Sequence, residues 1–175
     1  HLPGGLTGVG GMRVDMNGTL QTDTSTTGKF GFGGRAVIPA LVHSVHGFIL
    51  NNRRIFMLGI SDTGKAEILL AFFTENGIPD SSAGVNGLVH TGIIISGGDS
   101  FMASMQGDDK VLVLLSAADS SPTPLVICRF DPHSANRVTF LDSSYGDNGF
   151  GRNLIPPSII PKGMNAVSDF STVVS

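Results

Sequence analysis

The sequence predicts an all-β chain, and three features of its composition carry that prediction. Its 175 residues suffice for about one domain with a single sizeable core. Glycine accounts for 24 residues, about twice the usual share, and charged residues for only 14%. Twelve of the 14 acidic residues are aspartate, which turns favour, and only two are glutamate, which helices favour. We therefore expect short strands joined by many tight turns.

An internal repeat organises these turns along the chain. The segment NGIPDSSAGVNGLV at residues 76–89 corresponds to FLDSSYGDNGFG at residues 140–151 with an offset of 62 and six identities in eight positions. A weaker copy, NGTLQTDTSTTGKF, matches the first segment at an offset of 59 through Asn17, Gly18 and Gly28. The identities of the strong pair place Asp80, Ser81, Ser82, Gly84, Asn86 and Gly87 on Asp142, Ser143, Ser144, Gly146, Asn148 and Gly149.

We interpret the repeated segment as a structural turn. Short Asp and Ser side chains cap their own backbone in turns, and glycine supplies positive φ at no steric cost. A calcium site is the alternative, but the spacing differs from an EF-hand loop and no Glu stands at its far end. We therefore assign no catalytic, cofactor-binding or metal-binding residue. The structural turn positions are Asp80, Ser82, Gly84, Gly87, Asp142, Ser144, Gly146 and Gly149.

Short apolar segments between the turns predict strands, and four of them are almost continuously apolar. These four are residues 55–58, 68–73, 111–115 and 125–128. A strand with one wet face would alternate apolar and polar residues, so both faces of these strands should be covered. The expected strands are residues 36–42, 44–50, 54–60 and 67–73 in one unit, and 88–94, 101–106, 110–116 and 125–131 in the next.

Four-stranded antiparallel sheets that stack face to face satisfy this requirement, as the blades of a β-propeller do. We expect a single propeller-type domain over residues 1–175 with about three blades, its units being roughly 1–28 (partial), 29–87, 88–149 and 150–175 (partial). Residues 11–16 take a last-strand position and residues 155–175 take the first two positions, so the two ends are complementary halves of one blade.

Propellers usually have four to eight blades, so about three do not close a ring. We expect either a longer protein from which this chain is cut or association of copies, for example two chains that give six blades. The first residue, His1, fits a processed chain as well as a piece of a longer one.

The repeat resembles the delta-60 repeat family. That family's unit has an apolar strand ending in Arg-aromatic-Asn, then a glycine-containing turn and a Leu-Asp-x-Ser-Phe-Gly-x-x-Gly segment. The best match is Cys-Arg-Phe-Asp at residues 128–131 followed by Leu-Asp-Ser-Ser-Tyr-Gly-Asp-Asn-Gly at residues 141–149. The second copy departs with Pro79 for the Leu and Ala83 for the aromatic residue. The resemblance covers most of the chain, and it implies a β-propeller in a secreted or cell-surface protein, with no shared catalytic motif.

Other motifs weigh less than the repeat. GISDTGKA at residues 59–66 resembles a phosphate-binding loop, but an apolar strand follows it where a helix is needed. His43 and His46 would point to opposite faces of a strand, which argues against a shared zinc ion. Burial of Cys128 in an apolar strand should raise the pKa of its thiol, so it makes a poor nucleophile.

These observations favour a non-catalytic structural or binding scaffold that contacts other proteins or further copies of itself. Residues 61–65 and 118–123 are candidate contact loops. A carbohydrate-binding module is the alternative, and a fragment of a propeller hydrolase is a third hypothesis. The net charge of −3 without a basic stripe excludes a nucleic-acid partner, and no apolar run is long enough for a transmembrane helix.

Overall fold

The structure, a computed structural model, describes residues 8–14, 16–21, 30–40, 42–61, 66–95, 101–116 and 125–151. Within these ranges the chain forms ten β-strands and no helix, so no helix there could cross a membrane. The strands are β1 (Gly8–Met12), β2 (Arg35–Pro39), β3 (Val42–Ile49), β4 (Ile55–Ser61), β5 (Glu67–Phe73), β6 (Leu88–Ile94), β7 (Phe101–Met105), β8 (Val111–Ser116), β9 (Leu125–Phe130) and β10 (Phe150–Gly151).

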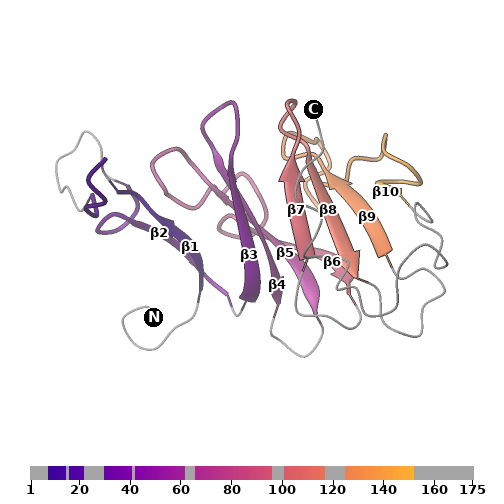
Figure 1. The fold of residues 1–175 in the computed structure, drawn as a ribbon, viewed down its shortest axis with the longest axis horizontal. Coiled ribbons are helices and arrows are strands. Elements are labelled where there is room, and N and C mark those ends of the chain that lie inside the picture. The colour runs from indigo at the N-terminus through magenta and orange to yellow at the C-terminus, as the bar shows by residue number, and fades with distance from the viewer. Residues whose placement is uncertain are drawn as a thin grey trace.

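The strands form three antiparallel sheets that follow one another along the molecule (Figure 1). The first sheet pairs β1 with β2, the middle sheet has the order β3-β4-β5-β6, and the third has the order β10-β9-β8-β7. Every pairing joins strands that are consecutive in the chain, so each sheet is a meander. The all-β prediction is confirmed for the described residues.

The sheets are staggered by one strand relative to the repeat units of the sequence. From the sequence we expected the strand after each repeated turn to be the first strand of the next unit. In the structure it is instead the last strand of the sheet that contains the strands before that turn. After residues 74–87 the chain returns and β6 pairs with β5, with Leu70 opposite Val89. The physical reason is that the repeated turn reverses the chain as a hairpin loop. The Phe72 amide donates across the base of that loop to the Gly87 carbonyl at 2.8 Å.

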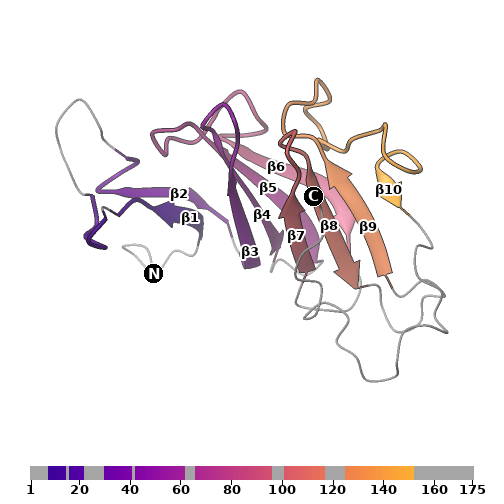
Figure 2. The ribbon, with the colours of Figure 1, turned by 45° about the horizontal axis from the view of Figure 1, so that its top comes forward.

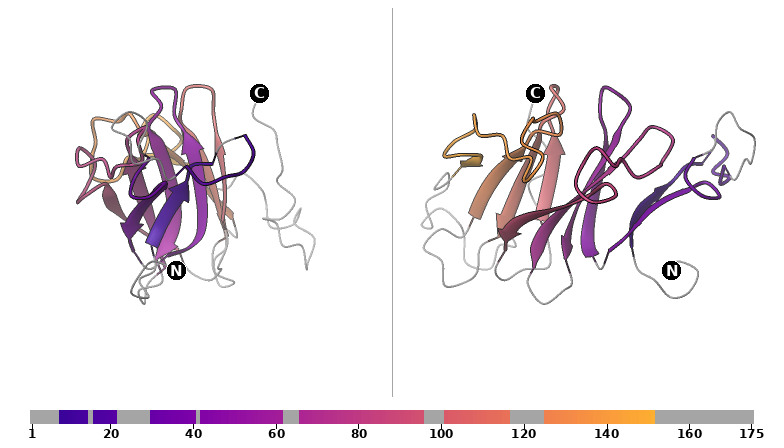
Figure 3. Two further views of the ribbon diagram at one scale, coloured as in Figure 1. Left: turned by 90° about the vertical axis from the view of Figure 1, so that its left-hand side faces the viewer. Right: turned by 180° about the vertical axis from the view of Figure 1, so that it is seen from behind.

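The middle sheet is covered on both faces, as the continuous apolar runs predict. On one face Leu58 and Ile60 lie in a large core together with Val111 and Val113 of the third sheet. On the other face the buried residues Met57, Ala71 and Phe73 pack with Val9, Ala36 and Ile38 of the first sheet. Figure 3 shows the three sheets in succession from behind, with the middle sheet between the other two.

Aromatic rings fill the space between the middle and third sheets. Phe72 of β5 lies 5.0 Å from Phe56 of β4 and 4.7 Å from Phe140, measured between ring centroids. All three side chains are fully buried. Phe140 comes from the loop between β9 and β10, so this loop helps to join one sheet to the next.

Replacing Phe72 by Ala should therefore destabilise the chain by about 3–5 kcal/mol, because it opens a cavity between two sheets. Chemical denaturation measures the free energy of unfolding. The matched control is Phe32→Ala, whose ring is 95% exposed and whose loss should change stability by less than about 0.5 kcal/mol. Equal effects of the two variants would contradict the two-sided core.

Candidate functional site

The repeated turns have the same geometry at both strong copies. The amide of Asp80 donates to the carbonyl of Phe72 at 2.9 Å, and the amide of Asp142 donates to the carbonyl of Arg129 at 2.9 Å. The Oδ1 atoms of the two aspartates accept the amides of Ser82 and Ser144, each at 3.0 Å. Each aspartate thus closes the turn around its own backbone, which is the capping role expected of these residues.

Each turn aspartate also binds a cation that precedes the second strand of its sheet. Arg54 Nη2 lies 2.6 Å from Asp80 Oδ2 ahead of β4, and Lys110 Nζ lies 3.2 Å from Asp142 Oδ2 ahead of β8. In the third sheet Arg129 Nη2 also approaches Asp142 Oδ2, at 2.7 Å. The Asp142 carboxylate therefore lies between two cations contributed by β9 and the β7–β8 turn.

These contacts shift the ionisation of the turn residues. Burial alone would raise the pKa of Asp142, but hydrogen bonds from Ser144 and the charges of Lys110 and Arg129 lower it to about 2. The pKa of Asp80 is lowered in the same way by Ser82 and Arg54, against the effect of burial. The pKa of Lys110 is raised, chiefly by its bond to Asp142.

The repeated glycines are needed because the backbone allows no side chain there. Gly84 and Gly146 both have positive φ, 56° and 54°. A Cβ on either would meet the carbonyl oxygen of the residue four positions on, Leu88 or Phe150. Gly87 and Gly149 end the two turns, also with positive φ, 81° and 96°. These positions are structural parts of the loop.

The weak first copy aligns in two pieces. Gln21 takes the place of the turn aspartate, because its amide donates to the Arg13 carbonyl at 2.8 Å. Gly34 takes the place of Gly87, since its carbonyl accepts the Arg13 amide at 3.1 Å. The sequence alignment of Gly28 with Gly87 is therefore wrong, because Gly34 makes the equivalent hydrogen bond. Gly28 itself lies outside the described residues. The offset shortens because extra residues separate the two pieces.

The two histidines of β3 correct another expectation. A β-bulge between His43 and His46 puts both residues on one face, opposite Ile60 and Leu58. Ser44, inside the bulge, has φ of 50°. The Nε2 of His46 donates to the Phe101 carbonyl at 3.1 Å, and its ring lies against the Phe101 ring. Within the described ranges no three His, Cys, Asp or Glu residues gather as metal ligands would.

The remaining sequence candidates add no reactive group to the described residues. Cys128 is fully buried, and burial raises the pKa of its thiol to about 12, as predicted. The loop that resembles a phosphate-binding motif is followed by the strand β5, as predicted, and not by a helix. Residues 62–65 of that loop are not among the described residues. Residues 118–123, the other candidate contact loop, are also outside it.

A buried carboxylate joins the second and third sheets at their loop end, which Figure 2 turns toward the viewer. Asp109, in the β7–β8 turn, accepts the amide of Asn51 from the β3–β4 turn with both oxygens, at 3.0 and 2.9 Å. His133 Nε2 donates to the same carboxylate at 2.8 Å. Asp109 occupies the repeat position of Arg53, and both have φ of 66°. This contact is a clasp between neighbouring sheets.

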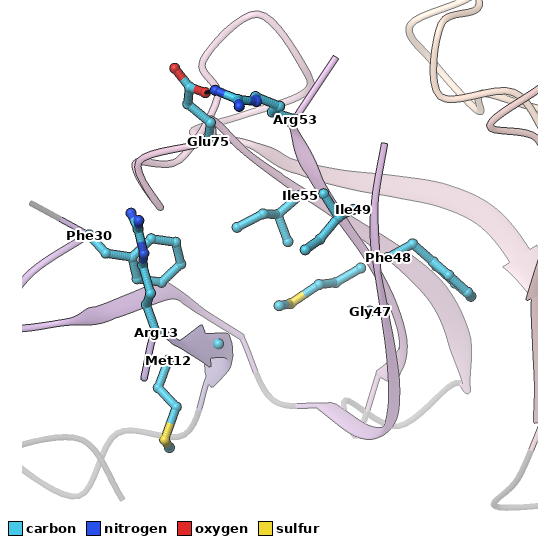
Figure 4. Close-up of a pocket in the computed structure, with 11 residues that line it drawn as sticks. Met12, Arg13, Phe30, Gly47, Phe48, Ile49, Arg53, Ile55 and Glu75 are labelled. Carbon is cyan, nitrogen blue, oxygen red and sulfur yellow. Dashed lines mark hydrogen bonds and ion pairs between the residues drawn. The ribbon is translucent and has the colours of Figure 1, made fainter. Parts of the chain in front are cut away.

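A groove lies between the first two sheets among the described residues, with a volume of about 560 Å³. Its floor is apolar, and it is open to solvent. Met12 and Ile49 on its walls are 66% and 69% exposed. Figure 4 shows Phe30 and Arg13 on one side, facing Ile49 and Ile55 on the other. The groove lining is Gly11, Met12, Arg13, Phe30, Gly47, Phe48, Ile49, Arg53, Ile55, Met57 and Glu75.

The groove has a polar rim at its loop end. Arg53 Nη1 lies 3.5 Å from Glu75 Oε2, and both side chains are exposed. Arg13 stands on the opposite wall, at the end of β1. Sequence reasoning did not select these residues, because a groove between two sheets depends on which strands are paired. The incomplete first repeat unit was the one feature of the sequence that could have pointed to a gap at this place.

The groove lies along an edge of the first sheet that has no partner strand among the described residues. The hydrogen bonds around Arg13 make β1 the counterpart of β5 and β9, which are third strands of their sheets. Within the described residues β1 pairs with β2 alone. The two strand positions that precede β1 in this sheet are therefore open there, and the groove occupies that space. An exposed edge with an apolar face beside it is suited to pairing with another strand.

The ion cluster around Asp142 yields a pH prediction. Its pKa is lowered in the folded chain, so its contribution to stability is present above the ordinary value of 3.8 and is lost as the pH falls toward about 2. We expect Asp142→Asn to melt at a lower temperature than the wild type at pH 7, and the difference to shrink by pH 2. Thermal melts at pH 7, 4 and 2 measure this, with the exposed Asp147→Asn as control. A difference that stays constant with pH would contradict the assignment.

Comparison with known proteins gives no further assignment. No family model matches the chain, and no curated protein or solved structure has significant similarity to it.

Proposed function

We propose that the protein is a non-catalytic binding scaffold of the β-propeller type, a repeat protein of the cell surface or the secreted fraction. Its groove between the first and middle sheets takes an extended polypeptide segment. The supporting observation is the outer edge of β1, which pairs with no strand in the part of the chain that the structure describes, beside a wide apolar groove. The resemblance to the delta-60 repeat family supports the propeller type and the location.

The stacking of the sheets supports the propeller architecture. The two four-stranded sheets are meanders that pack face to face, and β3 contacts β7, so the first strands of both lie on the same side. Neighbouring sheets are also joined by the Asp109 clasp. Blades of a propeller are arranged in this manner around a central axis.

The groove suits a polypeptide better than a small polar molecule. Its floor is formed by side chains such as Ile55 and Met57, and its charges lie only at the rim. A strand added to β1 would gain main-chain hydrogen bonds along the edge and would place alternate side chains over that floor. The exposed Met12 and Ile49 side chains would then leave water.

Carbohydrate binding is the second candidate, and one observation favours it. Phe32, at a turn next to the first sheet, is 95% exposed and offers a flat apolar ring. The only tyrosine, Tyr145, is covered by the Arg129 guanidinium at 4.6 Å, so it offers less. A glycan array with wild type and Phe32→Ala tests this candidate.

A peptide array tests the groove directly. Dodecapeptides with alternating apolar and polar residues should bind the full chain at nanomolar protein concentration, whereas scrambled peptides of equal composition should not. Ile49→Asp should abolish this binding, because it puts a charge on the groove wall. The matched control, Ile94→Asp, changes an exposed isoleucine of β6 outside the groove and should bind as the wild type does. Peptide binding that survives Ile49→Asp, or saturable glycan binding alone, would overturn the proposal.

A further inference from the structure

We infer that the groove receives the C-terminal segment of a second copy of this chain, with residues 170–174 paired as a strand against β1. The inference rests on the proposed function, because it names the partner of the same groove. Two copies would then complete each other's first sheet reciprocally.

The spacing of the chain selects these residues. β2 begins at Arg35 and β4 at Ile55, 20 residues later. β10 is the counterpart of β2, because both follow the repeated turn, and it begins at Phe150. Twenty residues beyond Phe150 is Phe170, the first residue of the run Phe-Ser-Thr-Val-Val. The equivalent spacing from β6 to β8 is 23 residues, so the run that begins at Phe170 matches the 20-residue spacing from β2 to β4.

The segment before this run fits an edge strand. β3 spans residues 42–49 and is the outer strand of its sheet, and its counterpart at the same spacing is residues 157–164. Those residues include Pro157 and Pro161. Proline is tolerated on an edge strand, where its missing amide removes no ladder bond. The 24 residues after Gly151 are therefore enough for the two strand positions that are open in the described part of the first sheet.

The register follows from the complete sheets. Ile55 pairs with Phe73 in the middle sheet, and Phe73 forms a bridge with Pro79. Val14 forms the equivalent bridge with Leu20, so Val14 is the counterpart of Phe73. Phe170, in the position of Ile55, should then lie opposite Val14.

The charges are complementary in this register. In the third sheet, Lys110 precedes β8 and approaches Arg129, both held by Asp142. In the first sheet, Arg13 has the position of Arg129, while Gln21 has that of Asp142, so the residue at this repeat position carries no carboxylate. The residue in the position of Lys110 is Asp169. The incoming strand would thus bring an acid close to Arg13, where Gln21 has replaced the aspartate of the other turns.

The direction of the chain points to a second copy. After β2 the chain enters the middle sheet, and after β6 it enters the third, so each step moves away from β1 (Figure 1). Continuation of this rule beyond β10 leads to the far side of the third sheet, away from the chain's own groove. Two copies with about three blades each give six, which is within the usual range of four to eight, whereas three copies exceed it.

A charge-reversal cycle on the full chain tests the inference. The wild type should have twice the chain mass by light scattering at micromolar concentration. Arg13→Glu and Asp169→Arg should each raise the dimer dissociation constant by about tenfold or more, because each places like charges together. The double variant should restore the wild-type value. The control Arg35→Glu makes the same charge change on exposed β2 and should leave the constant unchanged.

Engineered disulfides test the register independently of stability. Val14→Cys chains mixed with Phe170→Cys chains should give a covalent heterodimer on oxidation, whereas Val14→Cys with Ser171→Cys should not, because residue 171 faces the other side. Cys128 is fully buried and does not compete.

A monomeric wild type would overturn the inference, as would charge variants that do not restore one another. A Val14→Cys/Phe170→Cys double variant that closes only within one chain would overturn it too. This last result would identify the chain's own segment as the occupant. Peptide binding to a monomeric chain would leave the proposed function standing while this inference fails. Dimerisation that is insensitive to Ile49→Asp would instead contradict the groove as the site of contact.

Discussion

The middle sheet has two apolar faces, and the rest of the structure depends on covering both of them. Phe72 points toward the third sheet and Phe73 toward the first, although they are neighbours in β5. A sheet of this kind is stable only between two others, because either face alone would expose a large apolar surface to water. This constraint explains why the sheets form a stack. The first and third sheets, at the two ends of the stack, each have an outer face to which the same requirement applies.

The repeated turn allows the stack to be built from hairpins of similar length. Its aspartate caps the loop and holds the cation before the second strand, so one side chain links the loop to that strand. In the third sheet Asp142 holds both Lys110 and Arg129. In the first sheet, Gln21 replaces the aspartate at the place where the second strand itself is not among the described residues. The departure from the repeat therefore coincides with the groove.

The same repeat accounts for both the position of the groove and the proposed role of the sequence after β10. By their hydrogen bonds, β1 and β2 correspond to the third and fourth strands of the other two sheets, and in our proposal the sequence after β10 supplies the first and second. A binding scaffold that assembles through such an edge needs no reactive side chain. It needs main-chain donors and acceptors, an apolar floor and a charge at the edge, and Arg13 lies on the wall of this groove.

The sequence by itself determined the all-β class, the two-sided burial of the inner strands and the equivalence of Asp80 with Asp142. These depend on local patterns, namely turn chemistry and the spacing of apolar residues. Tertiary structure decided that each repeated turn closes a sheet, that a bulge turns His43 and His46 to one face, and that Gly34 rather than Gly28 ends the first loop. Tertiary structure also determined where the groove lies and which residues line it. Strand pairing joins residues far apart in the chain, and a pattern within one strand does not state which edge remains without a partner.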